Sequence, residues 1–418
     1  MADCSSSPTN LTQHMSPSSA VAPKTLGNRV AVLTGGFDKP YVFGLTMALA
    51  SKEVCLDVIG GDCVDSPEMH TTPGLNFINL QGNSGEVSFT RKISRLLIYY
   101  LRVIRYAAVA EAKIFHILWN NKLQYFDRTV LMLYYKLLGK KIAFTAHNVN
   151  AGKRDSNDSL LNRLTLRAQY LLADHIFVHT EQMKCELQRD FDVRGEAITV
   201  IPFGINNAVP HTTLSPGDAK RKLGIMRSEK TILFFGAIRP YKGLEYLVDA
   251  FLQLAATHPE YRLIIAGERR KGAEKYLDRI QETIRRNANQ GQIMQKIQYI
   301  SDEETELYFK AADLLALPYT HVFQSGVLFL AYSFGLPVVA TDVGSIREDI
   351  IEGRTGFQCR PSDSVDLARI IKKYFESDLF KNLDSRRQEI IGYANAQHSW
   401  DLVCEKTRNV YTELLVAR

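Results

Sequence analysis

The stretch RVAVLTGGF, residues 29–37, is an apolar run with β-branched residues that breaks at two glycines. Apolar residues at helical spacing follow in GLTMALASK (44–52), and CLDVIGG (55–61) has the composition of a second strand. A strand, a helix and a strand in close succession form a βαβ unit, whose two strands must run parallel. The beginning of the chain therefore predicts an α/β fold.

The same alternation fills the rest of the chain in two blocks. The runs that predict further strands are KIFHIL, KIAFTAHN, HIFVHT and ITVIPFG in the first block, and TILFFGAI, YRLIIAG, IQYI, LLALPY and LPVVATD in the second. A polar segment with three prolines, PFGINNAVPHTTLSPGD (202–218), separates the blocks. We predict two facing doubly wound, Rossmann-like domains, with the ligand site in the cleft beyond the carboxyl ends of their strands.

The overall composition is that of a globular protein. The 418 residues are enough for two hydrophobic cores, and 45% of them are hydrophobic and 23% charged. No stretch reaches the roughly 20 apolar residues that a membrane-spanning helix needs. The six cysteines are scattered and form no Cys/His cluster, which argues against a disulfide framework or a zinc site. We therefore expect a cytoplasmic protein.

The expected organisation along the chain has four parts. Residues 1–27 are rich in Ser, Thr and Pro and lack the features of a secretory signal, so we expect a disordered lead. The first Rossmann-like domain is expected over residues 28–205 and the second over residues 206–395. Residues 396–418 predict an amphipathic helix whose apolar residues share one face.

The segment RKISRLLIYYLRVIR (91–105) carries five basic side chains and no acidic one. On a helix its arginines gather on one side, opposite Ile93, Leu96, Leu97, Tyr100, Leu101 and Ile104. One interpretation is a helix packed on the core with a solvated basic face. The other is a helix that meets anionic lipid headgroups. No aromatic residues interleave with the cations on that face, so we do not expect nucleic acid as a partner.

The stretch FFGAIRPYKGLEYLVDAF (234–251) predicts an anion site. A strand ends at Gly236, and Arg239 and Lys242 then project from a short loop that leads into a helix. A diphosphate is best bound by cations that stay charged near neutral pH and by free backbone amides at a helix N-terminus. The alternative is a pair of solvated surface cations.

Further motifs follow in order: RLIIAGE (262–268), SDEETELYFKAADLLALPY (301–319) and QSGVLFLAYSFGLPVVATDVGSIRED (324–349). With them the chain resembles glycosyltransferase family 4, a large group of retaining enzymes with the GT-B architecture. The resemblance extends over residues 28–418 and is densest between residues 231 and 357. It implies that the first domain binds the acceptor and the second the nucleotide sugar, and that the C-terminal helix crosses back to the first domain.

The resemblance also implies roles for individual residues. Arg239 and Lys242 match the pair that binds the donor diphosphate and stabilises the leaving group, so we expect no metal ion or other cofactor. His147, in FTAHNVN, matches a histidine near the transferred sugar, and a structural role is its alternative. The other expected donor-binding residues are Gly35, Gly36, Gly236, Gly267, Ile300, His321, Gln324, Ser325, Gly326 and Val327.

These donor-binding residues fall into groups. Gly35 and Gly36 match a loop that packs against the donor phosphate and sugar, and residues 325–327 match a loop whose backbone amides approach the phosphates. Tyr299 and Ile300 fall where such proteins contact the base, although apolar residues at the end of a strand fit the core equally well.

The chain departs from its family at a pair of carboxylates. The family has Glu-x7-Glu before an Ala-Met-Ala-x-Gly segment, but the corresponding positions here are Val322 and Leu330. His321 and Gln324 lie beside the first position and offer replacement polar contacts. Glu348 remains where the family has an acidic residue, although a solvated glutamate at a helix start explains it equally well.

The predicted reaction moves a hexose from a GDP- or UDP-linked sugar to a hydroxyl acceptor, a lipid-linked or polysaccharide precursor, with retention at the anomeric carbon. The main alternative is a non-catalytic relative that binds or regulates, and the third is sugar epimerisation or phosphorolysis on the same fold. The expected partners are the nucleotide sugar and a saccharide or lipid-linked acceptor. In the lipid interpretation of residues 91–105, an anionic membrane surface joins them, and the cytoplasmic protein is peripheral at the inner face of a membrane.

Overall fold

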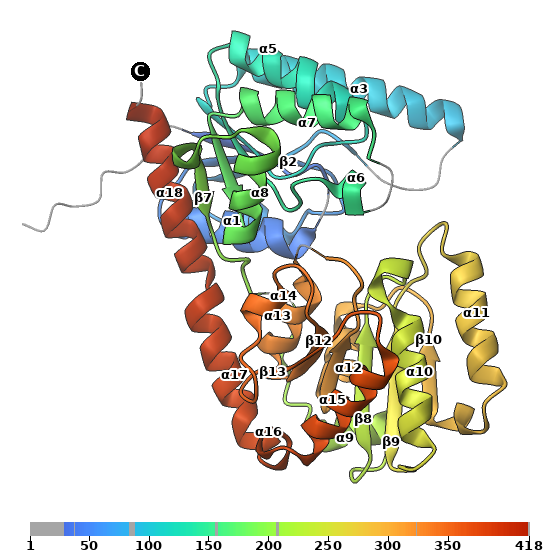
Figure 1. Cartoon of the computed structure of the whole chain (residues 1–418). Helices are drawn as coiled ribbons and strands as arrows, with labels where there is room; N and C mark the ends of the chain where they lie inside the picture. The colour runs from blue at the N-terminus through green and yellow to red at the C-terminus, as the bar shows by residue number, and fades with distance from the viewer. Residues whose placement is uncertain are drawn as a thin grey trace, which may run out of the picture.

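The computed structural model describes residues 29–36, 38–82, 88–154, 158–205, 209–322 and 324–416. They form two α/β domains, one above the other in Figure 1, each built on a parallel sheet. The predicted α/β class is therefore confirmed. None of the helices in the described ranges combines the length and apolar character needed to cross a bilayer.

The N-terminal domain is built on seven parallel strands in the order β3-β2-β1-β4-β5-β6-β7. The strands are β1 Val30–Leu33, β2 Leu56–Gly60, β3 Leu75–Asn79, β4 Ile114–Ile117, β5 Lys141–Thr145, β6 His175–Val178 and β7 Ile198–Val200. The order reverses between β1 and β4, which are direct neighbours. Such a switch point opens a crevice at the carboxyl ends of the two strands.

Helices cover both faces of this sheet. They are α1 Lys39–Ser51, α2 Pro67–Thr71, α3 Phe89–Val109, α4 Gln124–Phe126, α5 Met132–Leu137, α6 Ala151–Arg154, α7 Leu160–Leu172 and α8 Glu181–Phe191. A π-helical turn, Asp127–Leu131, joins α4 to α5. The apolar core on one face holds α1 and the C-terminal helix, and the core on the other face holds α3, α5, α7 and α8.

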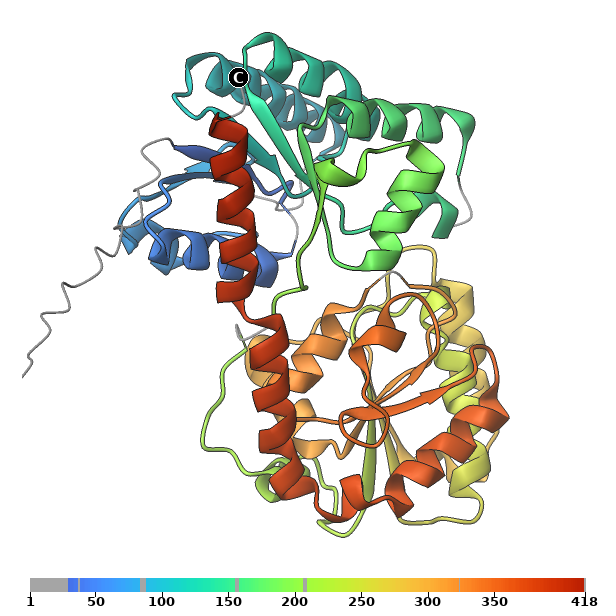
Figure 2. The ribbon, with the colours of Figure 1, turned by 60° about the vertical axis from the view of Figure 1, so that its left-hand side comes forward.

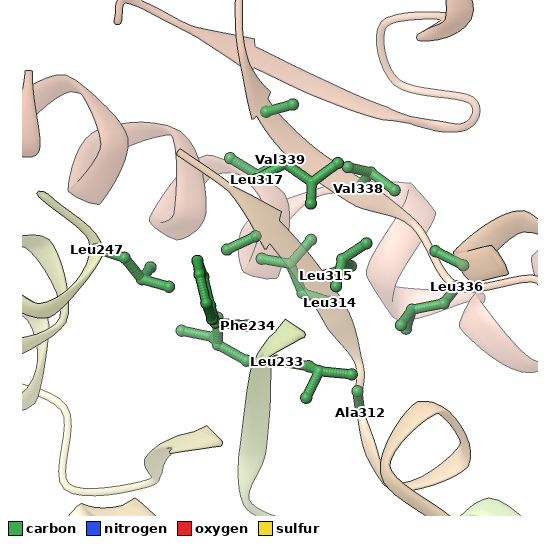
Figure 3. Close-up of a cluster of buried hydrophobic side chains, with 14 of the residues drawn as sticks. Leu233, Phe234, Leu247, Ala312, Leu314, Leu315, Leu317, Leu336, Val338 and Val339 are labelled. Carbon is green, nitrogen blue, oxygen red and sulfur yellow. The ribbon is translucent and has the colours of Figure 1, made fainter. Parts of the chain in front are cut away.

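The C-terminal domain has six parallel strands in the order β10-β9-β8-β11-β12-β13, with its switch point between β8 and β11. The strands are β8 Lys230–Phe235, β9 Tyr261–Ala266, β10 Ile293–Lys296, β11 Leu314–Leu317, β12 Val338–Thr341 and β13 Gly356–Cys359. Aliphatic side chains of the central strands fill its core, among them Leu233, Leu315 and Val338 in Figure 3.

The helices of this domain surround the sheet. They are α9 Pro216–Lys222, α10 Leu244–Ala255, α11 Glu274–Arg285, α12 Asp302–Ala311, α13 Gly326–Ser333, α14 Ile346–Asp349, α15 Ser364–Glu376, α16 Asp378–Lys381 and α17 Leu383–His398. The short helix α13 follows β11 and begins at the switch point, which puts its N-terminus beside the carboxyl end of β8.

One strand lies four residues before its predicted position. The prediction of a strand over IQYI is wrong, because β10 occupies the preceding residues IMQK and pairs there with β9. As an edge strand β10 carries the polar residues Gln295 and Lys296, so its apolar signal is weak. Ile300 packs from the following loop into the C-terminal core, whereas Tyr299 is 73% exposed.

The C-terminal end of the chain joins the two domains. Helix α17 packs on α13 of the second domain, and α18 (Trp400–Val416) packs on α1 and β4 of the first. Figures 1 and 2 show these two helices end to end along one side of both domains. Trp400 lies at their junction, where its ring packs against Gly44 and Gly204 and its Nε1 donates to the carbonyl of Ile205 at 3.0 Å.

Candidate active site

The carboxyl ends of both sheets meet at one cleft between the domains. Phe203, in the chain that connects them, contacts both walls: its ring centre lies 5.0 Å from that of His179 and 5.4 Å from that of Phe329. Beside it is a cavity of about 210 Å³, whose lining includes Asp38, Tyr41, Phe203, Gly326, Leu330 and Trp400. The predicted cleft site therefore has walls from both domains.

The glycine pair after β1 lies at the switch point of the first sheet. Gly35 and Gly36 have φ angles of 62° and 75°, a region that favours glycine. A Cβ on Gly35 would lie 2.7 Å from the Cβ of Trp119, which follows β4, and a Cβ on Gly36 would collide with Gln81. This tight turn leaves bare backbone at the edge of the cleft.

His147 follows β5 and is enclosed by aromatic rings. Its imidazole stacks on Trp119, with ring centres 4.0 Å apart and planes within 3°, and the ring of Tyr41 lies edge-on at 4.7 Å. Burial, reinforced by the neighbouring His179, lowers the pKa of His147 well below its usual value, so the ring is neutral at pH 7. Its Nε2 is buried and has no hydrogen-bond partner among the described residues. A buried nitrogen of this kind is costly unless a ligand satisfies it.

His179, which follows β6, determines which nitrogen of His147 carries the proton. The Nδ1 of His179 lies 3.4 Å from the carbonyl oxygen of Ile201, which only accepts, so this nitrogen carries a hydrogen. Burial lowers the pKa of His179 to about 4, so its other nitrogen, Nε2, is an acceptor at neutral pH. That Nε2 lies 3.0 Å from Nδ1 of His147, which must donate. The unpartnered Nε2 of His147 therefore holds a lone pair, suited to accept a hydrogen bond from a sugar hydroxyl.

Lys242 is a buried cation at the switch point of the second sheet. The turn after β8 places its Nζ 5.3 Å from the centre of the Tyr319 ring and 3.1 Å from where a Cβ on Gly236 would lie. Burial, with a smaller repulsion from Arg239, lowers the pKa of Lys242 to about 8. No carboxylate of the described ranges pairs with it. A buried ammonium without a counter-ion attracts an anion.

The ends of β8 and β9 approach each other closely around this lysine. A Cβ on Gly267 would overlap the carbonyl group of Gly236, so only glycine fits there. Arg239 precedes the turn in an extended conformation and is half-buried. Arg239 and Lys242 are therefore both present at the end of β8, as their spacing predicts.

The N-terminus of α13 completes the second wall. Ser325 is extended and directly precedes the helix. A methyl group of Val327 lies 3.5 Å from the Cβ position of Gly236, so the first turn of α13 and Lys242 border the same space. Gly326 faces the ring of Phe203. The first amides of a helix have no partner within it and favour an anion.

The remaining predicted donor-binding residues differ in their burial and position. The Oε1 of Gln324 is buried and has no hydrogen-bond partner among the described residues. His321 is exposed, and Ile300 lies in the core of the C-terminal domain. The structure thus brings the glycine loop and His147 to one wall, and Lys242 with residues 325–327 to the other.

The positions of the missing carboxylates are apolar and buried. Val322 is 7% exposed and Leu330 is 5% exposed, and Leu330 lines the cleft cavity. Glu348 is exposed on α14. Burial, with repulsion from Glu348, raises the pKa of the neighbouring Asp349 to about 8. At the cleft cavity the aliphatic side chain of Leu330 therefore stands where the family pattern has a carboxylate.

Sequence analysis missed five residues of the cleft. They are Tyr41, Trp119, His179, Phe203 and Trp400. His179 had the same signal as His147, a histidine directly after a strand, in the motif HIFVHT. The aromatic residues gave no signal, because such side chains are common in any core.

Two family profiles match the chain. Residues 40–209 match the one described as Glycosyltransferase Family 4, and residues 229–377 match the one described as Glycosyl transferases group 1. The chain belongs to the family 4-like glycosyltransferases. The two matches follow each other in the order of the two domains, and the predicted family is confirmed.

Curated relatives of this glycosyltransferase family member include D-inositol 3-phosphate glycosyltransferases. Those of Corynebacterium diphtheriae and Streptomyces avermitilis are each 25% identical to it. The alignments cover 65% and 59% of this chain and 64% and 53% of the relatives. The chain therefore spans less than two thirds of the length of these relatives.

Solved structures show the fold of this glycosyltransferase family member. Sucrose-phosphate synthase from Thermosynechococcus elongatus is 20% identical, with a TM-score of 0.74 over 94% of this chain and 100% of that chain. Anabaena HepE in complex with UDP and glucose is 18% identical, with a TM-score of 0.72 over 92% of this chain and 100% of that chain. The likeness confirms the predicted GT-B architecture of two facing domains.

Proposed function

We propose that this protein transfers a sugar from a nucleoside-diphosphate sugar to a hydroxyl acceptor. The observation that carries the proposal is the buried ammonium of Lys242, beside Gly236 and the N-terminus of α13, with no carboxylate partner in the described ranges. A diphosphate supplies the missing negative charge. We take a UDP- or GDP-linked hexose as the donor, which agrees with the UDP and glucose named for the HepE structure.

The proposed reaction retains the configuration of the anomeric carbon. The bond from that carbon to the diphosphate oxygen breaks, and a bond to the acceptor oxygen forms on the same face. The acceptor's proton passes to the leaving phosphate oxygen, so the step needs neither a carboxylate nucleophile nor a base from the protein. Arg239 and Lys242 stabilise the charge that develops on the diphosphate, which makes the reaction metal-independent. His147 accepts a hydrogen bond from a hydroxyl of the transferred sugar.

For the acceptor we propose a lipid-linked or polysaccharide precursor with a free hydroxyl group. The curated relatives are named for D-inositol 3-phosphate, so a small phosphorylated polyol is the comparison to include in any assay. Both acceptor classes use the same bond changes, because each offers a hydroxyl oxygen to the anomeric carbon.

A thermal-unfolding screen against nucleotide sugars and nucleoside diphosphates tests the donor site. A ligand at 100 times its dissociation constant adds about 2.7 kcal/mol to the free energy of unfolding. We expect UDP- or GDP-sugars and the matching diphosphates to raise the unfolding temperature, and the nucleosides alone to have little effect. If no compound in the panel shifts the transition, the assignment of the cleft as a donor site is wrong.

A second candidate function is that of a non-catalytic binding protein. The burial of Val322 and Leu330 at the positions of the two family carboxylates favours it. Such a protein would bind the donor without cleaving it. Release of nucleoside diphosphate by the purified chain, with water or an added acceptor, separates the two: turnover supports the transferase, and binding without turnover supports the binding protein.

A further inference from the structure

The outer face of the N-terminal domain exposes many large apolar side chains. Helices α3, α5 and α7 bury their inner sides in the same core against the sheet. Eight leucines of these helices are between 50% and 78% exposed: Leu160 and Leu161 at the start of α7, and six others, Leu97, Leu101, Leu133, Leu137, Leu164 and Leu171. We call these six residues the leucine surface. A large apolar surface on a folded protein marks an interaction site.

The three helices that carry this surface lie side by side. The hydroxyl of Tyr134 in α5 donates to the carbonyl of Ile104 in α3 at 3.2 Å. Arg128, in the turn before α5, donates to the side chain of Asn162 in α7 at 2.8 Å. Figure 1 shows the helices together at the top of the molecule, away from the C-terminal domain. The leucine surface is therefore one face and not three separate stripes.

The side of α3 that packs on the core is not the whole apolar side that the helical pattern predicted. Tyr99, Tyr100 and Val103 are buried against the sheet, whereas Leu97 and Leu101 point outward. The helical pattern placed a set of apolar residues opposite the arginines, and only some residues of that set face the core. The solvated side of the helix thus has an apolar row next to a basic row.

Exposed arginines of α3 border the leucine surface, and the two carboxylates that flank α7, Asp158 and Asp174, pair with Arg163 and Lys136. Arg91, Arg102 and Arg105 of α3 are exposed. Asp127, in the turn before α5, is the one acidic residue along the described parts of α3, of α4 through α5, and of α7, and it is buried. A helical face of exposed leucines beside arginines has the composition of interfacial membrane helices.

We propose that the leucine surface and its flanking arginines dock the protein on a membrane leaflet that contains anionic lipid. The leucines enter the boundary between headgroups and acyl chains, and the arginines contact lipid phosphates. A second copy of the chain fits this face less well. In a two-fold contact the arginines of both copies would border one interface, with no carboxylate on the described outer sides of α3, α5 or α7 to pair with them, and like charges repel.

The surface extends toward the cleft. The backbone N–H of Leu123, in the loop that leaves the carboxyl end of β4 at Ile117, donates to the hydroxyl of Tyr100 at 3.1 Å. Six residues later the hydroxyl of Tyr106 donates to Asp57, near the amino end of β2. The part of α3 before Tyr99 therefore projects past the strand ends on the cleft side. Docking through this part of α3 would place the cleft beside the membrane. A lipid-linked acceptor could then reach the cleft from the membrane, and this last consequence rests on the proposed function.

Sedimentation of the full chain with vesicles tests the docking. We expect the protein to pellet with vesicles of phosphatidylcholine plus phosphatidylglycerol, and much less with phosphatidylcholine alone. Arg102→Gln with Arg105→Gln should weaken partitioning onto the anionic vesicles about 30-fold, since each basic residue contributes roughly 1 kcal/mol. Leu97→Ser with Leu164→Ser should weaken it at least about tenfold, because two apolar contacts are lost.

Matched substitutions on the other domain serve as controls. Lys222→Gln with Arg227→Gln removes two exposed cations, and Met226→Ser with Val365→Ser removes two exposed apolar side chains. Neither pair should change vesicle binding. Every variant should keep the thermal shift with nucleoside diphosphate, which reports the donor site separately from the docking.

Three outcomes would overturn the proposal. One is no sedimentation of the unmodified protein with either vesicle, and another is sedimentation that survives both surface variants. The third is a dimer in solution that the Leu97→Ser/Leu164→Ser variant dissociates, which would assign the leucine surface to a second copy of the chain. Loss of the nucleotide shift with intact vesicle binding would instead reject the proposed function alone.

Discussion

The Nδ1 atom of His147 lies 3.0 Å from the Nε2 atom of His179, so the proton position on one imidazole depends on the other. The residues follow neighbouring strands, β5 and β6, and His179 is oriented in turn by the carbonyl of Ile201. Because burial lowers the pKa of both rings, the pair is neutral at pH 7. The unpartnered Nε2 of His147 therefore carries a lone pair and not a proton.

Substitution of His179 tests whether it sets the tautomer of His147. His179→Leu removes the acceptor and should lower kcat for sugar transfer about tenfold, the effect of one lost buried hydrogen bond. His179→Gln keeps an acceptor oxygen and should restore most of kcat. Neither change should alter the Kd for nucleoside diphosphate much, because the diphosphate site that we propose lies on the other wall. A loss of nucleotide affinity in both variants would indicate a structural role.

Removal of either cation at the end of β8 should abolish most donor turnover. In Arg239→Ala or Lys242→Met, one charge-assisted contact to the leaving diphosphate is lost, which typically costs about 3 kcal/mol of barrier, or a hundredfold in rate. Release of nucleoside diphosphate measures the effect. Lys222→Met, an exposed cation on α9, is the control. Near-normal turnover in both cleft variants would remove the active site from this position.

Nucleotide affinity should depend on pH through Lys242. Burial lowers the pKa of this ammonium from 10.5 to about 8 in the free protein, and a diphosphate favours the charged form. The affinity for nucleoside diphosphate should therefore be level below about pH 8 and fall by up to tenfold per unit above it. Calorimetric titrations from about pH 7 to about pH 10 measure this. In Lys242→Met the fall in affinity above about pH 8 should disappear. If the variant keeps the pH profile of the unmodified protein, another group causes the fall.

Lys242 should also make the folding stability depend on pH, and in this case the stability increases with pH whereas the nucleotide affinity decreases. Between about pH 8 and 10.5 the unfolded chain binds more protons at Lys242 than the folded chain does. The free energy of unfolding should therefore gain from this group as the pH rises through that window. Comparing chemical denaturation of the protein and of Lys242→Met across the window isolates the contribution, and parallel curves for the two proteins would contradict it.

Trp400 should stabilise the junction of the two domains. Its ring packs against Gly44 and Gly204, and its indole N–H binds the carbonyl of Ile205. Trp400→Ala should lower the free energy of unfolding by about 3 kcal/mol, whereas Trp400→Phe keeps most of the packing and should cost about 1 kcal/mol. Denaturant unfolding followed by circular dichroism measures both. Val416→Ala, 76% exposed at the other end of α18, is the control, and an equal effect there would contradict the role of Trp400.

The parts of the fold that the sequence predicted are those encoded by neighbouring residues. The run RVAVLTGG is apolar because β1 is buried on both faces, and it ends in glycines because the turn after it has positive φ angles. Arg239 and Lys242 were found in the same way, since a strand, a turn and a helix start fix their positions. The position of edge strand β10 was predicted wrongly, because half of its residues are polar and its pairing with β9 determines where it lies.

The sequence by itself determined two α/β domains, the order of their strands along the chain and the cations at the end of β8, because each is a local pattern of spacing and composition. Only the tertiary structure decided that His179 orients His147, that Trp400 lies between Gly44 and Gly204, and that three helices join their leucines into one outer face. These relationships connect residues far apart in the chain. They arise when sheets and helices pack, and no local pattern encodes which distant side chains then meet.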